Sequence, residues 1–142
     1  SSAASDVYKR QGKMASKTSK YAAVRTKLVA LQRGLAKKTD VIMDGRDIGT
    51  TVLPDAFAKI YLTASSDARA KRRYDELKEK GENCSFDAIK EDIEKRDYED
   101  MHRAISPLKQ ADDAVLVDTS DMNIEQVVAA LSKIIDEKKA GR

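Results

Sequence analysis

Apolar positions in the first third of the chain follow the spacing of a helix and then that of a short buried strand. From Ser19 onward, one helical face is predicted by four apolar residues at spacings of four, three and four: Val24, Leu28, Leu31 and Leu35. Two lysines and a threonine at 37–39 are expected to end this helix. The apolar run at 41–43, stopped by Asp-Gly, then predicts a buried strand that opens into a loop.

Two further strands are predicted, with two charged helices between them. The strands cover 59–63, after a Leu-Pro-Asp turn, and 114–119, where Val-Leu-Val is closed by an aspartate. The first charged helix is expected to have its N-cap at Ser65 or Ser66, and the second at Ser85. Because strands alternate with helices, the pattern predicts an α/β fold with a parallel sheet.

The last helix is expected to open with a capping box. Asn123 is followed three residues later by Gln126, the spacing that such a box needs. The apolar face of this helix is expected to be buried and consists of Ile124, Val127, Val128, Leu131, Ile134 and Ile135.

Composition limits the chemistry that the chain can perform. Its 142 residues, 41% of them hydrophobic, suit one modest domain. A single cysteine, Cys84, and a single histidine, His102, cannot build a zinc site, a disulfide or a cysteine-histidine-acid triad. No apolar run approaches the roughly 20 residues of a membrane span, so a soluble, cytoplasmic protein without a membrane partner is expected.

Charge is distributed unevenly along the chain. Residues 1–39 hold ten Lys or Arg and one acidic residue, whereas the remainder is acidic overall. A basic segment is compatible with a nucleic-acid-binding module, which is kept as an alternative, although few aromatic residues lie among the basic ones. Residues 1–13 have no helical or strand periodicity and are interpreted as a leader of non-native appearance.

The second charged helix carries the first candidate for a site. The stripe that begins with Ile89 and Ile93 continues at helical spacing as Arg96, Asp100 and Arg103. If the isoleucines face the core, the charges lie along the same wall and need partners or a ligand. The alternative is a set of exposed ion pairs of a few tenths of a kcal/mol, which are common on helices.

Two arginine-bearing segments add candidates for phosphate binding. Arg69, Arg72 and Arg73 lie at i, i+3 and i+4 on the first charged helix, and guanidinium groups match phosphate oxygens. A solvated basic face is the alternative there. The loop at 44–50, Asp-Gly-Arg-Asp-Ile-Gly-Thr, follows the first predicted strand, where parallel sheets bind ligands, and it supplies Arg46 as a donor and Asp47 as an acceptor.

Four motifs together resemble those of bacterial cytidylate kinases. They are GRDIGT at 45–50, VLPDA at 52–56, KIYLTAS at 59–65, and R-D-x-x-D-x-x-R at 96–103 with Pro-Leu behind it. The similarity runs from about Ala15 to the final helix. A third interpretation, a stand-alone nucleotide-binding or interaction domain, is less favoured by this pattern.

The resemblance implies a fold and a reaction. The fold would be a P-loop kinase-type parallel sheet with flanking helices, incomplete because its N-terminal strands are missing, in a partial nucleoside monophosphate kinase domain at 14–142 with a mobile lid at about 66–96. The reaction would be transfer of the γ-phosphate of ATP, bound with Mg²⁺, to CMP or dCMP. A monomeric parent enzyme with no nucleic-acid partner is expected.

The resemblance also implies roles for acceptor-binding residues. Ser16 and Arg25 match residues at the cytosine end of the acceptor, and Asp47 and Arg103 would complete that pocket. Arg46 matches a ligand of the acceptor phosphate and would act in catalysis.

Further matches concern the ribose and the lid. Arg96 and Asp100 match residues at the ribose and phosphate, with the aspartate accepting from a sugar hydroxyl and Arg96 also catalytic. The lid arginines, expected to bind ATP and to neutralise charge on the migrating phosphoryl group, are Arg69, Arg72 and Arg73.

One family motif does not occur in the 142 residues. No G-x-x-x-x-G-K-[ST] pattern is found, and that loop holds the donor phosphates in P-loop kinases. The chain is therefore interpreted as a fragment that is inactive alone. Since the strand before that loop lies between 41–43 and 59–63 in such kinases, these two strands are expected not to pair as in the family, and the fragment is expected to be marginally stable.

Overall fold

The computed structural model describes residues 21–141, and the chain divides after Asp44 into two units. The described part of the first unit contains the helix α2, Ala22–Ala36. This confirms the predicted helix, whose expected start at Ser19 lies outside the described residues. Its four apolar stripe residues are between 42% and 62% exposed.

The strand predicted at 41–43 is not formed. These residues have no regular secondary structure, and Ile42 is 98% exposed. An extended run becomes a stable strand only when a neighbour pairs its backbone N–H and C=O groups. No strand among residues 21–141 does so, since the described sheet consists of two later strands only.

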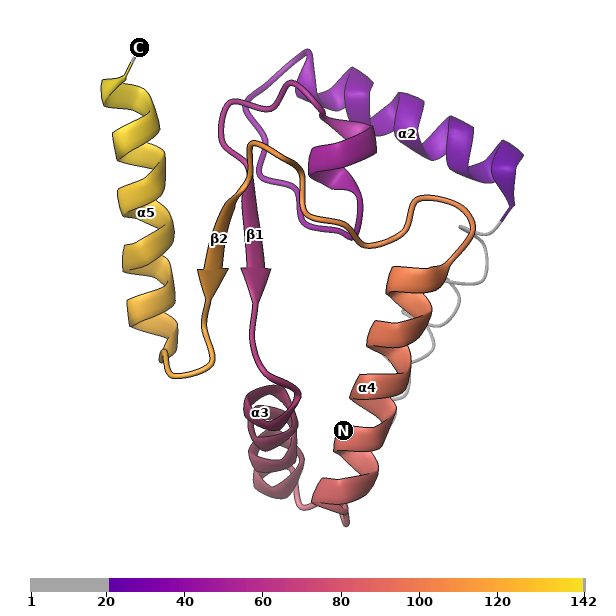
Figure 1. Ribbon diagram of the computed structural model, residues 1–142, viewed down its shortest axis with the longest axis vertical. Coiled ribbons are helices and arrows are strands. Elements are labelled where there is room, and N and C mark those ends of the chain that lie inside the picture. The colour runs from indigo at the N-terminus through magenta and orange to yellow at the C-terminus, as the bar shows by residue number, and fades with distance from the viewer. Residues whose placement is uncertain (1–20, 142) are drawn as a thin grey trace. The chain divides into compact units, whose positions relative to one another are not determined.

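The second unit is built on two parallel strands, β1, Ile60–Thr63, and β2, Val115–Asp118. They pair from Ile60 with Val115 to Thr63 with Asp118, and both arrows in Figure 1 point the same way. Residues of this type, β-branched, aromatic and aliphatic, suit a pleated sheet. The strands predicted at 59–63 and 114–119 and their parallel arrangement are confirmed, and the carboxyl ends of the two strands meet at one edge of the sheet.

Each later helix begins at the predicted cap. In α3, Ser66–Glu79, the Ser65 hydroxyl accepts from the backbone N–H of Ala68, and in α4, Phe86–His102, the Ser85 hydroxyl accepts from Ala88. In Figure 1, α3 follows the arrowhead of β1 directly, and α3 packs on α4. The expected lid, 66–96, thus corresponds to α3 and most of α4.

The final helix α5, Ile124–Ala140, has the predicted capping box but not the predicted buried face. The Asn123 side chain accepts from the Gln126 backbone, and the Gln126 side chain accepts from the Asn123 backbone. Yet Ile124 is 83% exposed and Val128 56%, so their predicted burial is wrong. A sheet of two strands offers too little surface to cover a whole helix face.

The core of the described residues is small. Its buried hydrophobic members are Val52, Ala70, Leu77 and Val117. Val52 ends a π-helical turn, η1, Ile48–Val52, and Ala70 and Leu77 lie two turns apart on α3. Within residues 21–141, no helix is long and apolar enough to cross a membrane.

Candidate functional site

A pocket of about 300 Å³ lies at the carboxyl ends of the two strands. Strand β1, the residue that follows β2, the first half of α3 and the last turns of α4 contribute to it. Its polar lining residues include Thr63, Arg69, Arg72, Asp97 and Thr119. We call it the strand-end pocket. Its position agrees with the rule that parallel sheets bind ligands where their strands end.

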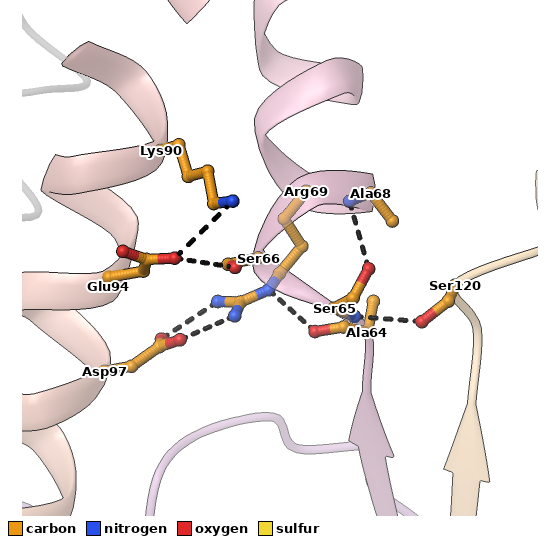
Figure 2. A network of polar contacts seen from close by, with 9 residues as sticks. All are labelled: Ala64, Ser65, Ser66, Ala68, Arg69, Lys90, Glu94, Asp97 and Ser120. Carbon is orange, nitrogen blue, oxygen red and sulfur yellow. Dashed lines mark hydrogen bonds and ion pairs between the residues drawn. The ribbon is translucent and has the colours of Figure 1, made fainter. Parts of the chain in front are cut away.

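Arg69 is held in this pocket by two different partners (Figure 2). Its two terminal nitrogens donate to the two carboxylate oxygens of Asp97, at 2.9 and 2.5 Å. Its Nε donates to the backbone carbonyl of Ala64, the residue after β1, at 3.0 Å. The hydrogen bond to Asp97 raises the pKa of Arg69 above its usual value, against the smaller effect of burial. The guanidinium therefore stays charged and oriented.

Arg72 is fixed at the end of the other strand. It donates to the carbonyl of Thr119 and, at 3.1 Å, to the carbonyl of Met122. Thr119 is 4% exposed, and its hydroxyl donates to the carbonyl of Thr63 at 3.0 Å, so the anchor itself is rigid. The loops that follow β1 and β2 thus each hold one arginine through backbone carbonyl groups.

Arg73 differs from its two neighbours. It pairs with Glu76 on its own helix at 2.7 Å and does not line the pocket. Glu76 also pairs with Lys80. The hydrogen bond from Lys80, and secondarily that from Arg73, lowers the pKa of the Glu76 carboxyl. Arg73 therefore fits the alternative interpretation of this arginine group, a solvated basic face of the helix.

A second polar group, which we call the Asp100 cluster, comprises Arg46, Asp100 and Arg103. The Nε of Arg46 donates to Asp100 at 2.9 Å, although the two residues are 54 positions apart. A terminal nitrogen of Arg103 lies 4.0 Å from the other oxygen of Asp100. Two guanidinium groups with one carboxylate carry net positive charge, which suits an anionic ligand with hydroxyl groups.

Local structure positions both sides of this cluster. Arg46 lies just before η1. The backbone carbonyl of Asp47, the cap residue of η1, accepts from the backbone N–H of Thr51 at 2.8 Å, and Val52 at the end of η1 is 2% exposed. A buried residue therefore anchors the turn. Opposite it, the end of α4 is held by a hydrogen bond from the backbone of Leu108 to the carbonyl of Asp100, at 2.8 Å. Arg103 donates to the carbonyl of Ser106.

The predicted convergence of five residues on one cleft holds for three of them. Arg46, Asp100 and Arg103 meet, whereas Arg96, one turn before Asp100, is exposed and makes no hydrogen bond or ion pair within the described residues. Asp47 is 7% exposed, beside Arg46 in the chain. From the same part of α4, Asp97 and Met101 line the strand-end pocket, and the place of Arg96 at a ligand stays a prediction.

Two predicted residues at the cytosine end are not tested by the structure. Ser16 lies outside the described residues, and Arg25 lies in α2, within the first unit. Their place in a cytosine pocket stays a prediction.

Sequence reasoning gave no role to Asp97 or Thr119. Asp97 lies inside the R-D-x-x-D-x-x-R pattern, but its partner Arg69 is 28 positions earlier. Thr119 directly follows β2, as Ala64 follows β1. The rule that ligands lie beyond the carboxyl ends of strands was the signal that could have indicated Thr119.

Comparison with known proteins identifies the family. The cytidylate kinase family model matches residues 8–137. The chain belongs to the cytidylate kinase family. It is 55% identical over 124 residues to a cytidylate kinase of Lactobacillus johnsonii, covering 87% of this chain and 54% of the relative. It is 48% identical over 127 residues to one of Thermosipho melanesiensis, covering 89% and 58%.

This family membership confirms the resemblance drawn from the four motifs. The chain spans about half the length of the curated relatives that it matches. The match begins at residue 8, inside the segment interpreted as a leader, whose assignment stays a prediction. The comparisons do not support a nucleic-acid-binding module. An α/β architecture with a small parallel sheet is compatible with part of a P-loop kinase fold.

Proposed function

We propose that this chain is part of an enzyme that transfers the γ-phosphoryl group of ATP to CMP or dCMP. The observation that carries the proposal is the Asp100 cluster, in which Arg46 and Asp100 meet across 54 positions within a chain of the cytidylate kinase family. Such a meeting of a loop arginine with a helix aspartate is not required by the sheet or by a cap. A ligand site explains it better than local stability does.

The Asp100 cluster is assigned to the acceptor. Arg46 binds the acceptor phosphate, since a guanidinium fork matches phosphate oxygens. Asp100 accepts a hydrogen bond from a sugar hydroxyl, with Arg96 approaching the ribose and phosphate from the preceding turn. Asp47 and Arg103 recognise cytosine, and the roles of Ser16 and Arg25 at the base rest on the family resemblance alone. Polar groups that hydrogen-bond a base reject a wrong base, because it would leave them unpaired.

The strand-end pocket is assigned to the donor phosphates. ATP fits its chemistry, because Arg69 and Arg72 present two guanidinium groups at the strand ends and each is oriented by a backbone carbonyl. Arg73 would join them only by leaving Glu76. The parent enzyme is proposed to be a cytoplasmic monomer.

The described residues offer no group of three acidic, histidine or cysteine side chains that could hold a metal ion. Mg²⁺, bound with ATP, would supply further positive charge to the phosphates. The arginine and aspartate side chains of this chain orient the substrates and stabilise charge.

The proposed transfer is a single in-line displacement. An oxygen of the CMP phosphate attacks the γ-phosphorus of ATP, the bond to the bridging oxygen breaks, and ADP leaves with that electron pair. Arginine side chains stabilise the charge spread over the migrating group, and no covalent enzyme intermediate is formed. Closure of α3 and α4 over the donor would exclude water that otherwise hydrolyses ATP.

A chimera tests this function. The segment of the Lactobacillus johnsonii relative that this chain matches is replaced by this chain, and ATP-dependent phosphorylation is followed by a coupled assay with CMP, dCMP, UMP and AMP. We expect turnover of CMP and dCMP well above that of UMP and AMP. A folded chimera that phosphorylates none of the four, or all four equally, contradicts the proposal.

A further inference from the structure

Asp97 occupies the position in the strand-end pocket that a phosphate would take. Its two oxygens lie in the fork of Arg69, at 2.9 and 2.5 Å from the two terminal nitrogens (Figure 2). A carboxylate and a phosphate each present two oxygens to this fork in the same bidentate geometry. One fork cannot hold both groups at once.

Arg69 has a second anchor besides Asp97. The Nε bond to the Ala64 carbonyl uses a separate donor and fixes the guanidinium to the end of β1. If Asp97 moved away, this bond would still direct the fork into the pocket. The arrangement therefore differs from an ordinary ion pair, in which each side chain orients the other.

The pair is also one that a ligand can open. Both side chains are about one-third exposed, 36% for Arg69 and 34% for Asp97, and solvent weakens such pairs. The Asp97 carboxylate has no other hydrogen-bond partner within the described residues.

Opening the pair would not separate α3 from α4. Figure 2 shows a second link, in which Glu94 accepts from Ser66 at 2.9 Å and lies near Lys90. Lys90 in turn pairs with Asp67 at 2.8 Å. These contacts hold the two helices together independently of Asp97.

From these observations we infer that Asp97 fills the Arg69 fork when no nucleotide is bound, and that phosphate oxygens of the donor nucleotide displace it. Asp97 is thus a positioning residue that acts through Arg69. The inference rests on the proposed function for the identity of the nucleotide, but its test does not require catalysis.

The test measures binding of inorganic triphosphate to the 142-residue chain by titration calorimetry at low salt. Asp97→Asn removes the competing charge and keeps the side-chain volume. We expect it to tighten binding about fivefold, which corresponds to about 1 kcal/mol and is the upper range for an exposed pair. A purely structural role would leave the affinity unchanged or weaken it.

Glu94→Gln is the matched control. It removes the same charge from the same helix, one turn earlier, without touching Arg69. We expect its affinity to stay within about twofold of wild type, since an exposed charge at longer range is screened. Equal gains in the two variants, no gain in Asp97→Asn, or no binding by either protein would overturn the inference.

A measurement on the wild-type chain covers the case in which Asp97→Asn does not fold. NMR of the Arg69 guanidinium and of the Asp97 carboxyl carbon is followed during triphosphate titration. We expect both signals to shift together, and a shift of Arg69 alone would contradict displacement. A chimera without CMP kinase activity would refute the proposed function and leave these binding results intact.

Discussion

The two arginine groups of the second unit are built in different ways. In the strand-end pocket, Arg69 and Arg72 are anchored by carbonyl groups that directly follow β1 and β2. In the Asp100 cluster, Arg46 reaches a helix from a loop, and its position depends on a side-chain pair in which Arg46 is 47% exposed. The first group is fixed by the sheet itself, whereas the second depends on how the 45–52 segment packs.

This difference shows which arginine side chains the small sheet can position by itself. Anchors on backbone carbonyls form whenever the two strands form, so the strand-end arginines are preorganised for charge. The Asp100 cluster depends on a loop instead, and under the proposed function a loop would suit a site that admits and releases an acceptor.

The largest effect is expected when the chain is assayed alone. The two arginine groups supply charge, but a backbone cradle with its lysine contributes several kcal/mol of transition-state stabilisation in P-loop kinases, at about 1.4 kcal/mol per tenfold in rate. We expect no measurable ATP-dependent phosphorylation of CMP by the 142-residue chain in a coupled assay. Turnover near that of ordinary kinases would mean that the two groups suffice.

A smaller effect is expected from overpacking the small core next to Arg69. Ala70 is fully buried on α3, one residue after Arg69. We expect Ala70→Leu to lower the free energy of unfolding by about 1 to 3 kcal/mol, measured by urea denaturation, because the added methyl groups have no room. Ala129→Leu, at an exposed position of α5, is the control and should change it by less than about 0.5 kcal/mol. Equal effects would show that α3 is not packed as described.

The smallest effect is expected on the stability of the fold at low pH. The Ser120 hydroxyl, and secondarily its backbone N–H, lower the pKa of Asp118 below its usual value of 3.8. A carboxyl with a depressed pKa in the folded state stabilises the fold above its unfolded pKa and loses that contribution as the pH falls through the folded value. Asp118 is linked through Ser120 to the cap of α3, since Ser65 donates to the Ser120 hydroxyl at 2.9 Å.

We therefore expect the stability difference between wild type and Asp118→Asn to shrink as the pH falls from 6 through about 4 and below. Urea denaturation at three pH values measures it. A difference that stays constant with pH would show that the bond to Ser120 does not perturb Asp118.

Local signals in the sequence predicted the second unit well. The caps at Ser65, Ser85 and Asn123 formed as expected, because each depends on a few neighbouring residues. The run at 41–43 failed as a strand because strand formation depends on a partner, which no local pattern reveals. The exposed Ile124 has the same cause, since its burial requires a wider sheet.

The candidate site shows the same contrast between local patterns and contacts that need tertiary packing. Helical spacing placed Asp100 and Arg103 on one face, and the strand-end rule indicated the loop with Arg46. Neither could find the pair of Arg69 with Asp97, which forms only when α3 packs on α4. For the same reason the sequence could not show that Arg73, unlike Arg69 and Arg72, turns to Glu76.

The assignment of the two arginine groups to the two substrates is the central claim, and steady-state kinetics of the chimera tests it most directly. We compare Arg46→Ala with Arg69→Ala, measuring KM for CMP and for ATP in each. The account predicts that Arg46→Ala raises KM for CMP by about tenfold or more and leaves KM for ATP within about twofold, while Arg69→Ala does the reverse, because each removes a charged hydrogen bond to one substrate. If both variants raise the same KM by similar factors, the two groups serve one substrate and the account is wrong.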